Sequence, residues 1–287
     1  MNKTISIIGG DSRQLFAAGY LIAKGFDVKI FACEHGRLPN KAVFAETLDE
    51  AFTSDIIILP LPVSKTVNQL NTPLSSMEIK IKDITDRITE NHVIFYGMGN
   101  PSFTKQVRAK TNYSTDYFLI EGLIYKNAFL TAEGILSIML EKIPTTLYGM
   151  KTAITGFGRI GTLTADKLIR LGADVTVFAR NEMQLIKAEL MGAKAYSLND
   201  IPIHIRDYDC VINTIPYPVI DKDTINNSNP ECVFIEAASA PYGIDGDACT
   251  KLGRTHIKAF SLPGKTAPKS AGIIIGETIY SELREVK

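Results

Sequence analysis

Short apolar runs alternate with helix-length amphipathic segments along almost the whole chain. Strand-length runs that are apolar throughout are typical of strands buried on both faces of a parallel sheet, and the amphipathic segments between them are typical of crossover helices. The alternation therefore predicts an α/β fold class with doubly wound parallel sheets of the Rossmann-like type. The expected strands are 4–8, 27–32, 55–61, 92–98, 151–155, 174–179, 209–215, 232–238 and 256–261.

Two further segments predict helices that connect domains. The first covers about 126–142, and the second covers about 269–284. Helices at two such places commonly bridge two doubly wound domains and leave an interdomain cleft. We expect an N-terminal Rossmann-like substrate domain at 1–125, followed by a bridging helix with a linker at 126–148. A cofactor-binding Rossmann domain should cover 149–266, and a C-terminal helix at 267–287 should pack back on the N-terminal domain.

An internal similarity supports two domains of like topology. Residues 21–31 align with 168–178 at an offset of 147, and six of the eleven positions are identical. The same offset places Gly9 on Gly156. Convergence is the alternative, because a helix that ends in glycine before a strand is a common connection. We favour two similarly built units.

A glycine-rich loop in the second half predicts a dinucleotide site. Gly156-Phe-Gly-Arg-Ile-Gly161 follows the strand 151–155 and opens a helix expected at 160–171. The first glycine permits a tight turn, the second lets the backbone approach a pyrophosphate, and the third allows close packing of helix on strand. The helix N-terminus offers free N–H groups to the phosphates. A glycine turn used only for packing fits this context poorly. The predicted cofactor-binding residues of the loop are Gly156, Gly158, Arg159, Ile160 and Gly161.

The end of the next strand favours NADP over NAD. NAD sites usually place a carboxylate there for the ribose hydroxyls, but this chain has Arg180 and Asn181. A guanidinium can bind the 2′-phosphate and stack on the adenine. The alternatives are that Arg180 is a solvated cation, or that Glu182 serves an NAD ribose.

A third candidate segment follows the strand 209–215. It contains Asn213, Thr214 and Pro216, and an Asn-Thr pair suits hydrogen bonding to the nicotinamide ribose or carboxamide. A strand-terminating turn explains any one of these residues equally well. We predict all three as cofactor-binding residues.

The first glycine loop, Gly9-Gly-Asp-Ser-Arg-Gln14, differs from the second at the positions that matter for phosphate. The alignment matches Asp11 to Gly158 and Gln14 to Gly161, so a carboxylate occupies the place of the pyrophosphate. Cys33 matches Arg180 in the same alignment. We therefore expect no second dinucleotide in the first domain, but a small ligand that bears a carboxylate, bound through Arg13 and Gln14. The alternative is that Asp11 is a helix N-cap and Arg13 is solvated.

Composition narrows the functional classes. The 31 basic and 31 acidic residues balance, and no basic stretch with interleaved aromatic residues occurs, which disfavours a nucleic-acid partner. The apolar runs are too short to span a bilayer, and the N-terminus passes directly into a strand-like run, so neither a membrane segment nor a secretory signal is expected. Four cysteines and four histidines show no metal-ligand spacing. We expect a cytoplasmic protein with reduced thiols and no metal.

Five motifs together resemble the A-subunit family of dipicolinate synthase. The GGDxRQ opening and the LPGxxAPKxAG ending are much more specific than the cofactor loop, and the likeness covers essentially the whole chain. Lys265 departs from the aliphatic residue expected inside the ending motif. The motifs are Gly9–Gln14, Thr131–Gly134 after Tyr125–Asn127, Gly156–Gly161, Ile212–Pro216 and Leu262–Gly272.

The resemblance implies an NADP-dependent oxidoreductase. Its expected reaction is the oxidation, with dehydration, of 4-hydroxytetrahydrodipicolinate or dihydrodipicolinate to pyridine-2,6-dicarboxylate. It also implies a partner, the flavoprotein-like B subunit of dipicolinate synthase, and a place in the mother-cell cytoplasm of a sporulating bacterium. Another two-domain dehydrogenase for hydroxy or amino acids, or a non-catalytic nucleotide-binding protein, remains an alternative. The oligomeric state is left open, with a homo-oligomer as one option.

That chemistry requires two anionic groups to be held near the nicotinamide, and positioning should supply most of the catalysis. Arg13 and Lys269 are the leading carboxylate binders, with Asn127 and Thr131 as neutral donors. The expected substrate is a small cyclic dicarboxylate. Candidates for a general base are Asp11, Glu121 and Glu133, of which we favour Asp11 and Glu133. The alternative for Glu133 is a helix carboxylate that interacts with the macrodipole.

Overall fold

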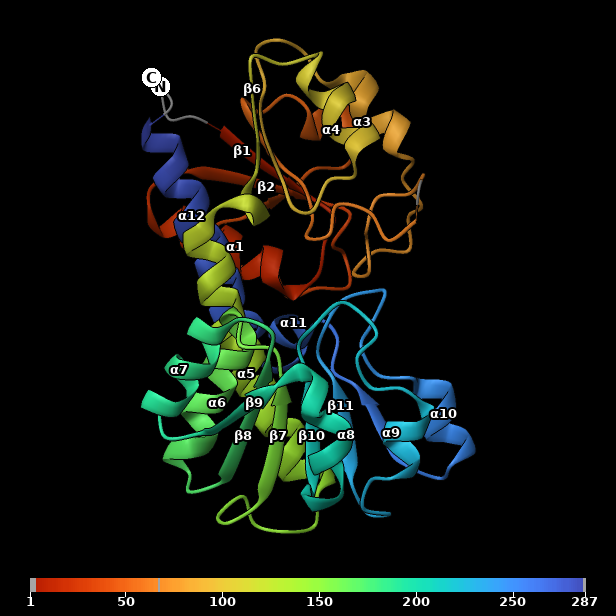
Figure 1. The fold of residues 1–287 in the computed structure, drawn as a ribbon. Helices are drawn as coiled ribbons and strands as arrows, with labels where there is room; N and C mark the ends of the chain where they lie inside the picture. Colours follow the sequence, from red (N-terminus) through yellow and green to blue (C-terminus); the bar gives the residue numbers. More distant parts are fainter. Residues whose placement is uncertain (1–3, 67, 286–287) are drawn as a thin grey trace. The chain divides into compact units, whose positions relative to one another are not determined.

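The structure is a computed structural model that describes residues 4–66 and 68–285. The chain forms two compact units. Unit 1 comprises Met1–Asn127 and Ala267–Lys287, and unit 2 comprises Ala128–Thr266 (Figure 1). The C-terminal segment therefore belongs to the same unit as the N-terminal half of the chain.

Unit 1 is built on a six-stranded sheet in which every described pair of strands is parallel. The strands are β1 Thr4–Ile8, β2 Asp27–Phe31, β3 Val43–Phe44, β4 Ile56–Ile58, β5 Val93–Tyr96 and β6 Tyr113–Asp116. Their order across the sheet is β3-β2-β1-β4-β5-β6, the Rossmann order. The direction of the chain reverses between β1 and β4, which is where such folds bind ligands at the carboxyl ends of the strands.

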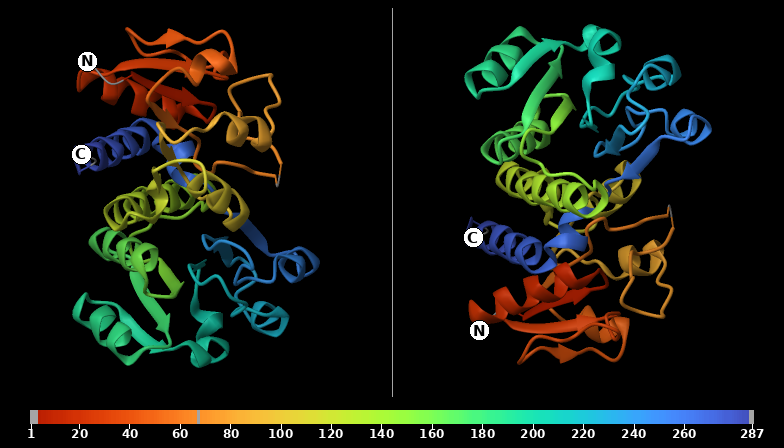
Figure 2. Two further views of the ribbon diagram at one scale, coloured as in Figure 1. Left: turned by 90° about the horizontal axis from the view of Figure 1, so that it is seen from above. Right: turned by 90° about the horizontal axis from the view of Figure 1, so that it is seen from below.

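Helices cover this sheet, and one of them comes from the end of the chain. Helix α12 packs lengthwise on α1, and Figure 2 shows the two helices side by side. Gly272 of α12 lies directly against the Arg13 carbonyl and the Phe16 Cβ, so a side chain there would collide with α1. The helices of this unit are α1 Ser12–Ala23, α2 Leu48–Ala51, α3 Ile81–Arg87, α4 Pro101–Arg108, the 3₁₀ turn η1 Tyr117–Leu119 and α12 Pro268–Glu285.

Unit 2 repeats the topology. Its strands are β7 Lys151–Thr155, β8 Asp174–Ala179, β9 Lys194–Ser197, β10 Cys210–Asn213, β11 Val233–Glu236 and β12 Thr255–Lys258. Their order is β12-β11-β10-β7-β8-β9, which is the same Rossmann order written from the other edge. Neighbouring strand residues such as Val211 and Ile212 enter different core clusters, because the sheet is buried on both faces.

Helix α5, Glu121–Lys142, runs from unit 1 into unit 2 and begins five residues before the predicted segment. Within the described part of the chain it is the one helix long and apolar enough to cross a bilayer, judged by length and composition alone. Ile135 and Met139 are fully buried in the unit 2 core, which explains part of its apolar character. The other helices of unit 2 are α6 Arg159–Arg170, α7 Glu182–Leu190, α8 Ile201–His204, α9 Lys222–Asn226, α10 Gly246–Lys251 and α11 Leu262–Thr266, with 3₁₀ turns η2 Leu198–Asp200 and η3 Ile205–Asp207.

The predicted fold class of two doubly wound parallel sheets is confirmed. Nine expected strands are present, several of them shorter than predicted. The sequence pattern missed β3, β6 and β9, which lie at the edges of their sheets. An edge strand is only partly buried and therefore lacks the continuous apolar run that marks the central strands.

Candidate functional site

The glycine loop of unit 2 lies at the carboxyl end of β7, between strand and helix. The Gly156 N–H donates to the Phe178 carbonyl of β8 at 2.8 Å, which ties the loop to the neighbouring strand. A Cβ on Gly161 would overlap the Gly156 carbonyl, so α6 packs directly on the loop. The first and third glycines of the motif therefore have the geometric roles that the sequence assigns to them.

The second glycine of the motif, Gly158, is exposed and open to solvent. It is the N-cap of α6, its backbone is extended (φ −83°, ψ −164°), and no described atom lies within 4 Å of a Cβ placed on it. Because the N-cap of α6 is a glycine, it has no side chain that could bond to the first N–H groups of the helix. A helix that begins at an open glycine suits a pyrophosphate.

The end of β8 presents Arg180 to solvent, immediately before α7. Asn181 is the N-cap of α7, and its side-chain oxygen accepts from the Met183 N–H at 2.8 Å. Arg180 therefore has the exposure that a phosphate anchor needs, whereas the Asn181 oxygen already has a partner in the protein. Both remain predicted cofactor residues.

Asn213 and Thr214 at the end of β10 are engaged within the protein. Asn213 is fully buried, and its oxygen accepts from the Thr155 hydroxyl at 2.6 Å and from the Ile215 N–H at 3.1 Å. The Thr214 hydroxyl donates to the Thr155 carbonyl at 2.8 Å. These bonds join the ends of β7 and β10 beneath the glycine loop. Asn213 is placed to hold the loop rather than to contact a ligand, and Pro216 is exposed beyond it.

Glu236 at the end of β11 completes this network and was not predicted from the sequence. Its carboxylate, 1% exposed, accepts from the Asn213 amide at 2.7 Å and from the Ala238 N–H at 2.9 Å. The other oxygen accepts from the Gly243 and Ile244 N–H groups at 2.8 and 3.0 Å. One charge thus orders the loop 237–244. The signal in the sequence was an isolated acidic residue that ends an apolar run.

The corresponding loop of unit 1 is closed by the chain itself. The Gly10 N–H donates to the Asn71 carbonyl at 2.8 Å, and a Cβ on Gly9 would lie 2.9 Å from the Thr72 methyl. The segment around Asn71 therefore covers the loop where unit 2 is open. The expectation that unit 1 has no dinucleotide site of its own stays a prediction.

Asp11 and Arg13 form a partly buried ion pair in this closed loop. Asp11 caps α1 and accepts from the Arg13 Nε at 2.9 Å and Nη2 at 2.8 Å. The Arg13 Nη2 also donates to the Leu61 carbonyl. Gln14 is fully buried, and its side-chain oxygen accepts from the Asp11 N–H at 3.2 Å to close a capping box. The Asp11 and Gln14 groups are therefore occupied, and they fix the orientation of Arg13.

Cys33 occupies the position in unit 1 that Arg180 has in unit 2. It is fully buried, and its thiol donates to the Gly9 carbonyl at 3.3 Å. Burial, together with the neighbouring Glu34 and Asp11 charges, raises the pKa of the Cys33 thiol to about 12. The residue is a neutral thiol at physiological pH and offers no charge to a phosphate.

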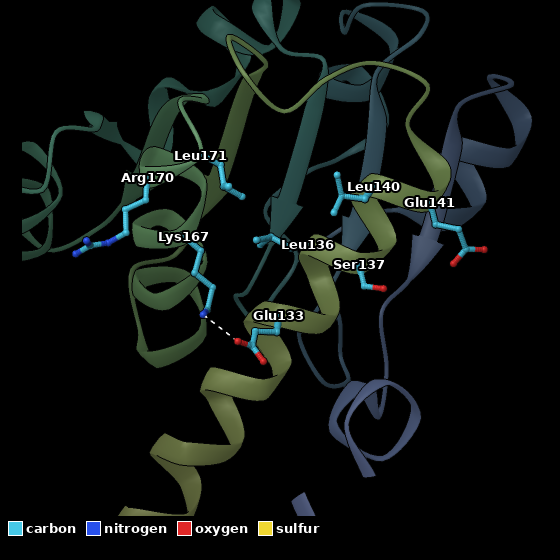
Figure 3. Close-up of a pocket in the computed structure, with 8 residues that line it drawn as sticks. All are labelled: Glu133, Leu136, Ser137, Leu140, Glu141, Lys167, Arg170 and Leu171. Carbon is cyan, nitrogen blue, oxygen red and sulfur yellow. Dashed lines mark hydrogen bonds and ion pairs between the residues drawn. The ribbon is translucent and has the colours of Figure 1, made fainter. Parts of the chain in front are cut away.

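The remaining predicted residues lie on α5 and α12. Glu133 forms an ion pair with Lys167 of α6 at 3.3 Å (Figure 3). Lys167 lies nine residues beyond Gly158, which is roughly 13 Å along the helix from the glycine loop. The ion pair disfavours Glu133 as a base at the cofactor site, although the assignment remains a prediction. Thr131 is buried, Asn127 is half-buried, and Lys269 is exposed in the first turn of α12.

The described residues contain no group of three or more His, Cys, Asp and Glu side chains placed to hold a metal ion. The four cysteines are buried and free of disulfides. The site is therefore defined by backbone N–H groups, one exposed arginine and a buried polar network.

Two family models match the chain, one in each unit. Residues 4–118 match the N-terminal domain of the dipicolinate synthase A subunit. Residues 130–262 match the NAD binding domain of D-isomer specific 2-hydroxyacid dehydrogenases. The second match supports an oxidoreductase with a nicotinamide cofactor and agrees with the open glycine loop. It does not distinguish NADP from NAD.

Similarity to known proteins extends across both units. The dipicolinate synthase A subunit of Bacillus subtilis is 29% identical over 287 residues, which cover 99% of this chain and 96% of that protein. The crystal structure of the corresponding Bacillus halodurans protein superposes with a TM-score of 0.87 at 26% identity, covering 98% and 97% of the two chains. The Bacillus subtilis structure gives 0.85 at 28% identity, covering 100% and 97%. The resemblance to the A-subunit family of dipicolinate synthase is thereby confirmed over nearly the entire chain.

Proposed function

We propose that this chain is the A subunit of a dipicolinate synthase. Its substrate is 4-hydroxytetrahydrodipicolinate, or the dihydrodipicolinate that forms from it by loss of water, and its product is pyridine-2,6-dicarboxylate. The observation that carries the proposal is the contrast between the two glycine loops, because one is open at Gly158 and the other is closed by Asn71. In this proposal unit 2 binds the dinucleotide, and the closed loop of unit 1 excludes a second one. One dinucleotide site is sufficient for the oxidation of one small substrate.

The residues present fit NADP. Gly158, the N-cap of α6, leaves open space where a side chain would stand, and Gly156 and Gly161 allow the loop and α6 to pack closely on each other. We assign the pyrophosphate to the backbone of this loop and the 2′-phosphate to Arg180. NADP⁺, when bound, supplies the acceptor for a hydride from the substrate ring, while a proton is lost and the ring becomes aromatic.

We assign the substrate-binding roles from side-chain chemistry, although Arg13 and Thr131 are buried in this structure. We assign one substrate carboxylate to Arg13, whose guanidinium is held in place by Asp11 and indirectly by Gln14. The second carboxylate is assigned to Lys269, which is exposed at the start of α12. Asn127 and Thr131 are assigned as neutral donors. Because aromatisation supplies much of the driving force, positioning of the ring carries most of the catalysis in this proposal.

A direct assay tests the proposal. We expect the purified chain, supplied with NADP⁺ and freshly prepared hydroxytetrahydrodipicolinate, to produce NADPH and dipicolinate in equal amounts, measured by absorbance and by chromatography. Arg13→Ala and Lys269→Ala should lower turnover at least about 100-fold, because each removes a charged contact worth about 3 kcal/mol. NADPH binding should persist in both variants.

Other outcomes separate the remaining alternatives. Cofactor binding without dipicolinate, even after the B subunit is added, would contradict the proposal. Turnover of a hydroxy or amino acid instead would favour another two-domain dehydrogenase. Unchanged activity of the two-subunit complex after both substitutions would favour a non-catalytic nucleotide-binding role. We place the enzyme and its partner, the flavoprotein-like B subunit, in the mother-cell cytoplasm of a sporulating bacterium.

The choice of NADP is tested at Arg180. We expect Arg180→Ala to weaken NADPH binding roughly 10- to 100-fold, because a charge-assisted contact with the 2′-phosphate is lost. NADH binding should change less than about 3-fold, since NADH lacks that phosphate. Titration of both cofactors by fluorescence measures the effect.

Lys187→Ala is the matched control for this experiment, because Lys187 is another exposed cation on α7, away from the end of β8. It should leave both affinities unchanged. If the unmodified protein binds NADH as tightly as NADPH, the 2′-phosphate assignment is wrong, whatever Arg180→Ala does.

A further inference from the structure

A pocket beside the edge strand β12 of unit 2 has no role in the proposed function. It lies between α10 and β12, and its volume is about 710 Å³. We call it the α10–β12 pocket. Its lining includes Tyr242, Asp247, Thr250, Arg254, His256 and Lys258.

The α10–β12 pocket is separate from the glycine loop. Strand β12 is three strands away from β7 in the sheet order, which is roughly 14 Å at the usual strand spacing. His256 pairs in register with Phe234 of β11, so the two side chains point to the same face of the sheet. Phe234 packs in one core cluster with Ala248 of α10, whereas α6 packs in the cluster that the alternate β11 residues form on the other face. The pocket and α6 therefore lie on opposite faces of the sheet.

Charges of both signs line the pocket and are not paired with each other. The Lys258 ammonium group is exposed and has no ion-pair or hydrogen-bond partner in the described part of the chain. The carboxylate of Asp247, exposed in the first turn of α10, likewise has no partner among the described residues. The two other acidic residues of the lining are engaged, since Glu236 accepts the N–H groups described above and Asp245 caps α10 by accepting from the Ala248 N–H at 2.9 Å. Lys258 and Asp247 are thus both available to a ligand.

The two other basic residues of the pocket are less available. The Arg254 guanidinium donates to the hydroxyl and the carbonyl of Ser228, at 3.3 and 3.4 Å. The His256 ring lies against the backbone of α10, because a Cβ on Gly246 would be only 2.7 Å from its Nδ1. Burial lowers the pKa of His256, so this side chain is neutral at pH 7. Lys258 is therefore the cation with which a ligand in the pocket can pair.

An aromatic pair forms a further wall of the pocket. Tyr242 stacks on Phe260, with ring centroids 5.1 Å apart and an angle of 16° between the ring planes. The φ of Tyr242 is 61°, in the left-handed region that a bulky residue seldom adopts, so the backbone holds this ring in place at a conformational cost. Tyr242 is 38% exposed, which leaves part of its ring surface open to an apolar group of a ligand.

From these groups we infer that the α10–β12 pocket binds a zwitterion of the α-amino acid class with an aromatic or apolar side chain. Its carboxylate pairs with Lys258, its ammonium group pairs with Asp247, and its side chain packs on Tyr242. A simple anion would meet the negative charge of Asp247, and a simple cation would meet the positive charge of Lys258. This inference is independent of the reaction, because none of these residues is assigned to the cofactor or to the substrate.

Ligand-observed NMR titration of the full chain with L-phenylalanine tests the inference. We expect saturable binding with a dissociation constant below about 1 mM. Two further probes keep the aromatic ring but carry one charge each, since 3-phenylpropionate lacks the ammonium group and phenethylamine lacks the carboxylate. Each should bind at least about 10-fold more weakly than phenylalanine, because one charge-assisted contact is lost.

Two charge-removing substitutions locate the site. Asp247→Asn and Lys258→Met nearly keep the size of the side chain, and each should weaken phenylalanine binding about 10-fold. Asp247→Asn should not weaken the binding of 3-phenylpropionate, and Lys258→Met should not weaken that of phenethylamine, because in each case the probe lacks the group that the lost charge would bind. Lys251→Met is the matched control, since Lys251 is exposed on α10 outside the lining of the pocket. Unchanged NADPH binding should show that all three variants fold.

Three results would overturn the inference. The first is that phenylalanine shows no saturable binding below about 1 mM. The second is that 3-phenylpropionate or phenethylamine binds as tightly as phenylalanine, which would mean that the pocket does not recognise both charges. The third is that phenylalanine binding survives both Asp247→Asn and Lys258→Met, which would place the bound amino acid elsewhere.

Discussion

Replacement of Gly158 by alanine is expected to abolish dinucleotide binding and to leave the free protein stable. The residue is exposed, its φ of −83° suits alanine, and no described atom lies within 4 Å of the added Cβ. The methyl group would instead occupy the space where a pyrophosphate approaches the backbone. We expect an affinity loss of at least about 100-fold, equivalent to ~2.7 kcal/mol. Calorimetric titration with NADPH measures it.

Two other glycines provide the comparison that makes this prediction specific. Gly161→Ala should lower both cofactor affinity and the thermal unfolding midpoint, because its Cβ would overlap the Gly156 carbonyl even without ligand. Gly122→Ala, at the start of α5 with no described atom within 4 Å of the added Cβ, should change neither. A Gly158→Ala variant that binds NADPH normally would show that the loop is a packing turn.

The central part of the fold could be predicted because its residues are buried on two sides. The apolar runs at β1, β4, β7 and β10 reflect strands that contact core clusters on both faces of a sheet. The repeat between the two halves then indicated a shared topology. Three of the four edge strands, β3, β6 and β9, escaped prediction because they are only partly buried and lack the apolar run that identifies a strand, whereas the edge strand β12 was predicted.

The candidate site was predictable only where function constrains backbone geometry. The spacing of the three glycines can be read from sequence because Gly156 and Gly161 answer local steric demands, whereas the role of Gly158 at a pyrophosphate stays a prediction. The closure of the first loop by Asn71 could not be read in this way, since a contact between residues 10 and 71 depends on the tertiary fold. For the same reason, the sequence did not show that Asp11 and Arg13 pair with each other.

Glu236 is another residue whose contacts depend on the tertiary fold and could not be read from the sequence. Its replacement is the second substitution for which we expect a large effect. The carboxylate accepts four N–H groups in a fully buried network that joins β10, β11 and the loop 237–244. Glu236→Gln keeps the shape but turns an acceptor into a donor, so two N–H groups lose their partner. Each buried unsatisfied donor costs about 1–3 kcal/mol. The loss of about 2–6 kcal/mol should lower the thermal midpoint by roughly 4–24 °C, and cofactor affinity should weaken because Asn213 loses its support.

A substitution at Asn213 tests whether the effect of Glu236→Gln comes from the hydrogen-bond network or from a general intolerance of any change at Glu236. Asn213→Asp alone should destabilise the protein strongly, because it places a second carboxylate beside an oxygen that Asn213 now approaches at 2.7 Å. In the double variant Glu236→Gln with Asn213→Asp, the glutamine amide can donate to the new carboxylate, so part of the stability should return. Glu231→Gln, at an exposed position before β11, is the control and should be neutral. If the double variant loses more stability than the two single variants lose together, the assigned donor and acceptor roles are wrong. The pair between the glutamine amide and the new carboxylate would then contribute nothing to stability.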